Sequence, residues 1–188
     1  MRDLTRQEIE ALSHQCVRDY AAWCQQQSVP EMHAGPYYLF LERIVEAIQP
    51  TGTVVEIGTA SGASALCLAK ALPDGVRLVT YDIDGGANRW TRQNERIVAY
   101  VCDSSQDDPR IPADISLLFL DGCHDDEGVA ADVRTWGPKV VPGGYVLFDD
   151  PLVYGGSLTA IAEQWPTAEV IRLDHLHHTG FGCLRVPA

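Results

Sequence analysis

Acidic side chains follow several short apolar runs in the sequence. Glu56 interrupts VVEIG, Asp82 follows LVTY, Asp121 follows LLFL, and Asp149 and Asp150 follow YVLF. A carboxylate beside a buried strand is costly unless it is paired or bound to a cation. The pattern therefore indicates a ligand that carries positive charge, either a metal ion or a small molecule with a cationic or amino group.

The first of these runs ends in a turn with two glycines, EIGTASG (56–62). Glycine lets the backbone pass close to a ligand and turn sharply into a helix. A dinucleotide-binding turn would also have glycine at positions 60 and 63, where this chain has alanine, and no GxxxxGK(S/T) loop occurs. The turn therefore disfavours a nicotinamide dehydrogenase and a nucleotide hydrolase. A tight turn without a ligand is the alternative.

Two further strand ends carry groups that suit a nucleoside. Asp82 lies about 20 residues after Gly62, the spacing at which an acid accepts hydrogen bonds from both ribose hydroxyls. The segment CDSSQD (102–107) offers short polar side chains to the edge of a base. The alternatives are a solvated acidic strand end and an Asx or Ser turn.

A metal site is expected where the later strands end. Asp121, Asp149 and Asp150 gather there with His124. Ligation by carboxylate oxygens favours Mg2+, Ca2+ or Mn2+ over zinc. In the alternative interpretation the adjacent aspartates cap a turn before Pro151, and His124 is a surface residue.

Alternating helices and strands must position these residues. Apolar spacing predicts helices over 5–27, 37–48, 64–72, 88–94, 126–140 and 157–165, and strands over 54–57, 77–81, 97–101, 115–120, 145–148, 169–173 and 182–186. Apolar strands joined by helices indicate a doubly wound, mostly parallel α/β sheet, here with an antiparallel C-terminal hairpin at its edge. We expect one α/β domain, in which residues 1–50 form a helical cap and residues 51–188 a Rossmann-like core.

The chain is acidic overall, with 14 Lys and Arg against 26 Asp and Glu in 188 residues and a formal net charge of -12. Nucleic acids and anionic membranes are disfavoured as partners, because both require basic residues. The six cysteines form no CxxC pair, the N-terminus lacks an apolar signal segment, and no apolar run is long enough to span a bilayer. These features predict a cytoplasmic protein with free thiols.

Residues 53–150 resemble a class I S-adenosylmethionine-dependent methyltransferase, and more closely its metal-dependent O-methyltransferase branch, which includes catechol and sugar O-methyltransferases. The resemblance rests on EIGTASGAS (56–64), TYDID (80–84), CDSSQD (102–107), LFLDGCHDD (118–126) and PGGYVLFDD (142–150), with a weaker match at PEMHAGPYY (30–38). The whole superfamily shares the first motif. The DGCH and FDD motifs are typical of the metal-dependent branch.

The resemblance implies a role for each matching position. It implies that Glu56, Gly58, Gly62 and Ser64 line the methionine part of S-adenosylmethionine, and that Thr59 and Asp121 also bind the cofactor. It implies that Asp82 holds the ribose, and that Ile83 and Ser105, or Ser104 instead of Ser105, contact the adenine. It implies Asp121, Asp149 and Asp150 as ligands of Mg2+, or of Mn2+ or Ca2+. His124 stands where the family has a catalytic Lys or His, so His124 and Asp121 are the implied catalytic residues.

The implied reaction is an in-line attack of a hydroxyl oxygen on the sulfonium methyl group, with His124 taking the proton. Catechol enzymes have an aromatic residue where this chain has Cys123. The expected small-molecule acceptor is therefore a sugar or polyol, within a class that includes vicinal diols and phenols. The alternatives are a metal-free class I methyltransferase and a cofactor-binding protein without catalysis. A second copy of the chain that helps to close the site is a further expectation.

Two other clusters allow two interpretations each. The segment DHLHH (174–178) would present His175 and His177 on one face if it were extended, which suggests a second metal site, but polar surface near a hairpin turn is favoured. The aromatic segment 30–38 either covers the site as a lid or packs the helical cap onto the sheet.

Overall fold

The chain folds into the predicted doubly wound α/β sheet. The computed structural model describes residues 1–85, 90–106, 110, 113–123, 125–151 and 155–188. The strands are β1 (Thr53–Ile57), β2 (Leu78–Asp82), β3 (Ile97–Val101), β4 (Ile115–Leu120), β5 (Val140–Asp149), β6 (Val170–Arg172) and β7 (Phe181–Arg185). The helices are α1 (Arg6–Cys24), α2 (Tyr37–Ile48), α3 (Ala63–Lys70), α4 (Asp126–Trp136) and α5 (Gly155–Gln164), with short 3-10 helices η1 (Pro30–Ala34) and η2 (Gly137–Lys139).

The described residues form a seven-stranded sheet in the order β3-β2-β1-β4-β5-β7-β6. The first five strands pair in parallel, whereas β7 pairs antiparallel with both β5 and β6, as the predicted C-terminal hairpin requires. The chain winds outward from β1 to β3 and then returns to β4 on the other side of β1. Ligands of such sheets bind where the winding reverses, at the carboxyl ends of the central strands.

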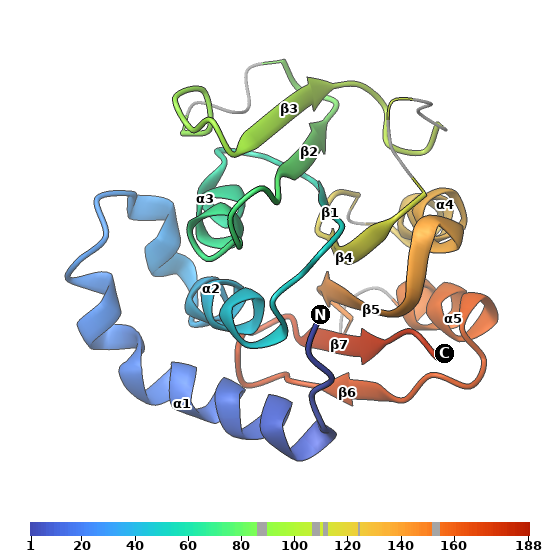
Figure 1. Ribbon diagram of the computed structural model, residues 1–188, viewed down its shortest axis with the longest axis horizontal. Helices are drawn as coiled ribbons and strands as arrows, with labels where there is room; N and C mark the ends of the chain where they lie inside the picture. Colours follow the sequence, from blue (N-terminus) through green and yellow to red (C-terminus); the bar gives the residue numbers. More distant parts are fainter. Residues whose placement is uncertain (86–89, 107–109, 111–112, 124, 152–154) are drawn as a thin grey trace.

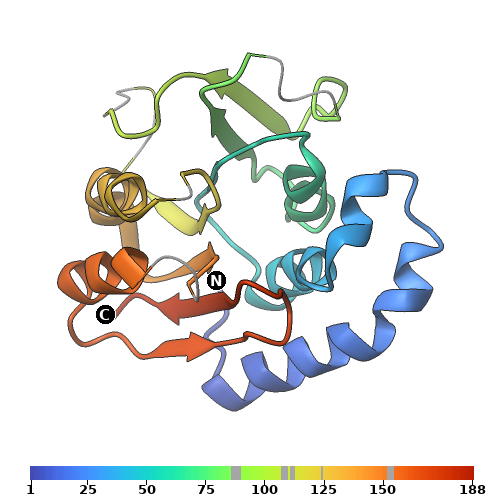
Figure 2. The same ribbon diagram turned by 180° about the vertical axis from the view of Figure 1, so that it is seen from behind.

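Helices cover both faces of the sheet. Figures 1 and 2 show α2 and α3 on one face, with α1 outside α2, and α4 and α5 on the other face. Side chains of β4 alternate accordingly: Leu117 and Phe119 join the core under α2 and α3, and Leu118 and Leu120 join the core under α4 and α5. Within the described ranges, no helix combines the length and the apolarity that a membrane span requires.

Most predicted elements are present, with differences at their ends. The helix predicted over 126–140 ends at Trp136 and continues as η2, because Pro138 has no N–H group for a helical hydrogen bond. Strand β5 therefore begins at Val140, before the predicted start at residue 145. Of the helix predicted over 88–94, residues 90–93 form turns, and residues 88 and 89 lie outside the described part of the chain.

A buried carboxyl group stands near the carboxyl end of β1. Glu56 is fully buried and accepts a hydrogen bond from the hydroxyl of Thr80 on β2. Burial raises the pKa of Glu56 to about 7, and hydrogen bonds from Ser64 and Thr80 oppose that shift. Below this pKa the fold holds Glu56 in its neutral form, so the stability of the fold is coupled to pH.

Glu56→Gln is expected to remove this coupling. Since the folded pKa is raised from 4.5 to about 7, the stabilisation of the protonated form is fully present below pH 4.5 and is lost as pH rises through 7. The free energy of unfolding of the wild type, relative to Glu56→Gln, should fall by roughly 2–3 kcal/mol between pH 4.5 and pH 8. Urea unfolding at both pH values measures it.

The exposed Glu163→Gln is the matched control for replacing a carboxyl with an amide. If the free energies of unfolding of the wild type and Glu56→Gln differ by the same amount at both pH values, the fold does not hold Glu56 protonated.

Candidate functional site

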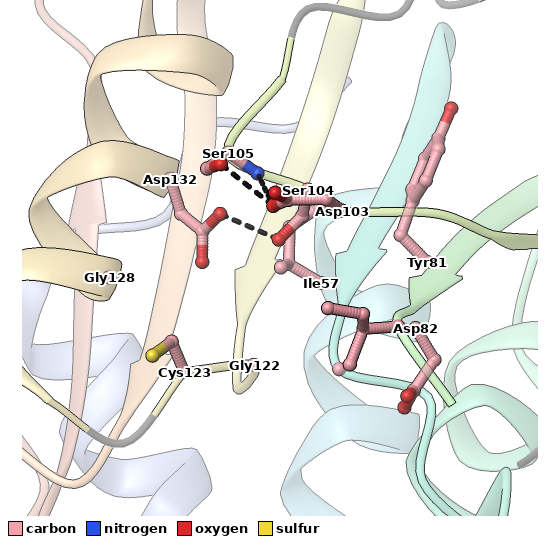
Figure 3. Close-up of a pocket in the computed structure, with 12 residues that line it drawn as sticks. Ile57, Tyr81, Asp82, Asp103, Ser104, Ser105, Gly122, Cys123, Gly128 and Asp132 are labelled. Carbon is pink, nitrogen blue, oxygen red and sulfur yellow. Dashed lines mark hydrogen bonds between the residues drawn. The ribbon is translucent and has the colours of Figure 1, made fainter.

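A cavity of about 450 Å³ lies at the carboxyl ends of β1 to β4. It is lined by residues that end or follow these strands and by residues of α4: Ile57, Gly58, Tyr81, Asp82, Ile83, Asp103, Ser104, Ser105, Gly122, Cys123, Gly128 and Asp132. Figure 3 shows Cys123 and Asp132 on the α4 side, and Tyr81 and Asp82 on the opposite side. The cavity lies where the winding of the sheet reverses, and its volume is in the range of small-molecule sites.

The structure places the predicted cofactor-binding residues in two groups. Gly58, Asp82, Ile83 and Ser105 line the cavity, together with Ser104, the alternative to Ser105. Glu56 on β1, Thr59 in the turn after β1 and Ser64 on α3 are buried, and Gly62 is the N-cap of α3. Asp121 belongs to neither group and lines a smaller cavity. The residues expected around the ribose and adenine therefore meet at the cavity wall, whereas most of those expected near the methionine part support the turn beside it.

The turn after β1 depends on glycine. Gly58 has φ 94°, a conformation that residues with a Cβ rarely adopt. A Cβ at Gly58 would lie 1.9 Å from the carbonyl oxygen of Asp121, so the backbones that follow β1 and β4 are in direct contact. This close approach brings the acidic end of β4 next to the turn.

Asp82 is held at the cavity wall by backbone groups. Its carboxylate accepts hydrogen bonds from the N–H of Ala60 at 2.7 Å and the N–H of Asp84 at 2.8 Å. Each carboxylate oxygen can accept further hydrogen bonds, as two ribose hydroxyls would require. The neighbouring residue Ile83 is 78% exposed, which leaves an apolar surface for the face of a base.

The opposite wall is a network of serines and acids. Asp103 accepts hydrogen bonds from the backbone N–H and the hydroxyl of Ser105, which lower the pKa of Asp103. The hydroxyl of Ser104 donates to Asp132 Oδ1 at 2.7 Å. Asp132 is buried on α4, and this burial raises its pKa to about 6.

Asp132 is a cavity residue that the sequence interpretation did not single out. Its signal is present nevertheless: Val129, Asp132, Val133 and Trp136 follow the helical spacing of one apolar face, and Asp132 is the acid on that face. An acid at such a position is buried and requires a hydrogen-bonding partner, which here is Ser104.

A second, smaller cavity joins the three predicted metal ligands. Asp121, Asp149 and Asp150 all contribute to its lining. The pKa of Asp121 is raised well above its ordinary value, first by burial and then by the negative charges of Asp149, Glu56 and Asp150. Burial also raises the pKa of Asp149. Such mutual repulsion is relieved by a cation.

His177 is the cationic or metal-ligating partner that the structure adds to these acids. Its Nδ1 lies 3.0 Å from Asp149 Oδ1 and 3.7 Å from Asp150 Oδ1. Among the described residues, Asp149, Asp150 and His177 form a group whose ligand atoms all lie within 4.8 Å of one another, and Asp121 is not in that group. The hydrogen bond to Asp149 raises the pKa of His177. The predicted catalytic residue His124 lies outside the described residues.

The interpretation of segment 174–178 as polar surface is wrong for His177. Its side chain is 14% exposed, because the turn between β6 and β7 directs it toward the end of β5. His175 on the same turn is exposed and interacts instead with α1, where its Nε2 lies 2.9 Å from Ser13 Oγ. The sequence alone does not separate the two histidines, since a turn has no fixed periodicity.

The aromatic residues at the start of α2 pack beside the acids. The Tyr37 ring lies 4.1 Å from the Tyr38 ring and 4.9 Å from the His177 ring, measured between centroids. Both tyrosines are buried. Burial and the charge of Asp121 raise the pKa of Tyr37. The start of α2 thus packs against His177, which lies beside the acids.

Comparisons with known proteins agree with this architecture. No curated protein matches the sequence. An S-adenosylhomocysteine-bound methyltransferase from Podospora anserina has a TM-score of 0.67 at 15% identity, over 100% of this chain and 99% of that one. The O-methyltransferase TomG from Streptomyces achromogenes, which is involved in tomaymycin synthesis and was solved with S-adenosylmethionine, has a TM-score of 0.61 at 18% identity, over 96% and 90%. At these identities the likeness shows the fold.

Family models identify the chain by its sequence. The model described as a methyltransferase domain matches residues 55–151, which is more than half of the chain. A second model, described as O-methyltransferase, matches residues 7–96. The matched ranges include the turn after β1, Asp82, and the acids that end β4 and β5. The chain therefore belongs to the methyltransferase-domain family and is a class I S-adenosylmethionine-dependent O-methyltransferase.

Proposed function

We propose that this protein transfers the methyl group of S-adenosylmethionine to a hydroxyl of a small molecule, with the assistance of a divalent metal ion. The observation that carries the proposal is the group formed by Asp149, Asp150 and His177, whose ligand atoms lie within 4.8 Å of one another. Asp121 lines the same small cavity as Asp149 and Asp150, and that cavity shares Gly122, Cys123 and Asp132 with the larger one. An acidic metal site next to a nucleoside-sized cavity suits the methylation of a coordinated oxygen.

The donor set fits a divalent ion. Carboxylate oxygens and an imidazole nitrogen are common ligands of divalent metals. Burial, and after it the charge of neighbouring carboxylates, raises the pKa of Asp121 and Asp149, and a cation would offset both effects. Asp149 and Asp150 would hold the ion, with Asp121 next to them. When bound, such an ion lowers the pKa of a coordinated hydroxyl and fixes its orientation.

The remaining residues act on the cofactor and the proton. Asp82 binds the ribose hydroxyls, and the exposed Ile83 packs against the adenine. The carboxyl groups around Asp121 would attract the positively charged sulfonium group of the cofactor. On the ground of the sequence resemblance, His124 is the proposed proton acceptor. The proposed acceptor is a sugar or polyol with two adjacent hydroxyls. If both of its oxygens bound the metal ion, one of them would be oriented for in-line attack.

Asp82→Asn is expected to weaken the binding of S-adenosylmethionine by roughly 10–100-fold, because hydrogen bonds from two hydroxyls to a charged acceptor are lost or weakened. Isothermal titration measures the affinity. The control is Asp84→Asn, which makes the same chemical change at an exposed position two residues away. If the two variants bind the cofactor equally well, Asp82 does not hold the ribose.

Removal of divalent metal is expected to abolish methyl transfer without abolishing cofactor binding, because Asp82 and Ile83 lie in the cavity, away from the Asp149 group. Methyl transfer to a panel of sugars, polyols and phenols is measured with excess chelator and again after Mg2+ or Mn2+ is added. Full activity in excess chelator would contradict the role of the metal and favour the metal-free alternative.

A further inference from the structure

We propose that His177 is a direct ligand of the metal ion through Nδ1, so that the site has a mixed nitrogen and oxygen donor set and prefers Mn2+ to Mg2+. This inference rests on the proposed metal-assisted function and changes its chemistry. The sequence implied three carboxylates, which is an all-oxygen set. The structure instead groups one imidazole with two of these carboxylates.

The position of His177 is fixed by backbone pairing. Strand β7 pairs antiparallel with β5, with Phe181 opposite Asp149. The N–H of Asp150 donates to the carbonyl oxygen of Gly180 at 3.3 Å, and the N–H of Gly180 donates to the carbonyl oxygen of His177 at 3.0 Å. The turn that carries His177 is therefore connected to the ends of β5 by consecutive hydrogen bonds.

The spacing of the donor atoms fits coordination. Two ligands at right angles, each about 2.1 Å from a common ion, are about 3 Å apart. Nδ1 of His177 lies 3.0 Å from Asp149 Oδ1 and 3.7 Å from Asp150 Oδ1. A nitrogen lone pair this close to a carboxylate requires a proton or a metal ion near both atoms.

The ring is also held in a defined orientation. The Tyr37 ring packs against it at 4.9 Å with an angle of 46°, and the Thr179 hydroxyl lies 2.8 Å from Nδ1. Only 14% of the side chain is exposed. A ligand restrained in this way loses little freedom when it binds a metal. Imidazole binds divalent transition metals, Mn2+ among them, more readily than it binds Mg2+, which prefers oxygen ligands and retains its waters.

The alternative is that His177 only orients Asp149 through a hydrogen bond. The two roles predict different results. A positioning residue affects all divalent metals alike, because it acts through a shared carboxylate. A direct nitrogen ligand affects Mn2+ more than Mg2+ and leaves a magnetic signature of nitrogen on the bound ion.

The test uses Mn2+ bound to the full chain. Electron spin echo envelope modulation of the wild type should contain a contribution from directly coordinated 14N, which disappears when the protein is labelled with 15N-histidine. His177→Ala should lose this contribution and bind Mn2+ roughly 10–100-fold more weakly, with a much smaller change for Mg2+. His175→Ala, an exposed histidine on the same turn, should retain both the modulation and the affinity.

Absence of nitrogen modulation in the Mn2+-loaded wild type would overturn the proposal, and so would an equal loss of Mg2+ and Mn2+ affinity in His177→Ala. The labelling experiment uses the native sequence, so a missing nitrogen signal overturns the proposal even if the variant does not fold. Because the chain has six histidines, a signal that is present is assigned to residue 177 by its loss in His177→Ala and its retention in His175→Ala. If Mg2+ still restores methyl transfer while no nitrogen is bound, the metal-assisted function stands and the ligand assignment fails. If the wild type binds no metal ion and is fully active in excess chelator, both the metal-assisted function and the ligand assignment are wrong.

Discussion

Repulsion among buried carboxyl groups is the constraint on which the site depends. Glu56, Asp121, Asp149 and Asp150 lie at or near the carboxyl ends of β1, β4 and β5, and burial raises the pKa of the first three. Such an arrangement is stable only if protons or cations offset its charge. The sulfonium cofactor and a divalent metal would both do so. The same excess of buried carboxyl groups would therefore favour the binding of both the cofactor and the metal ion.

The topology of the sheet brings these acids together. Reversal of the winding between β1 and β4 opens the cavity, and Gly58 allows the two strand ends to touch. The antiparallel β7 then carries a turn back to the end of β5. Without β7, the turn that carries His177 would not be held beside Asp149. The C-terminal hairpin therefore completes the acidic site as well as the edge of the sheet.

Much of the fold could be predicted from the sequence. Short apolar runs that alternate with helical patterns indicate a parallel sheet, and the spacing of Asp82 after the glycine turn indicates the end of its second strand. Local patterns also predict which residues end each parallel strand, and hence the positions of Ile83 and Asp121. The contribution of His177 depends on how a turn folds back across the sheet, which no periodicity encodes. Asp132 has a readable signal as an acid on an apolar helix face, yet its partner Ser104 lies in a distant loop.

A crystal structure with S-adenosylhomocysteine tests the central claim most directly, since the claim concerns where the cofactor lies relative to the acids. The account predicts the ribose hydroxyls on Asp82, the adenine between Ile83 and the Ser104–Ser105 segment, and the sulfur directed toward Asp121 and Asp149. Binding of the cofactor outside this cavity, or with its sulfur directed away from the acids, would contradict the account.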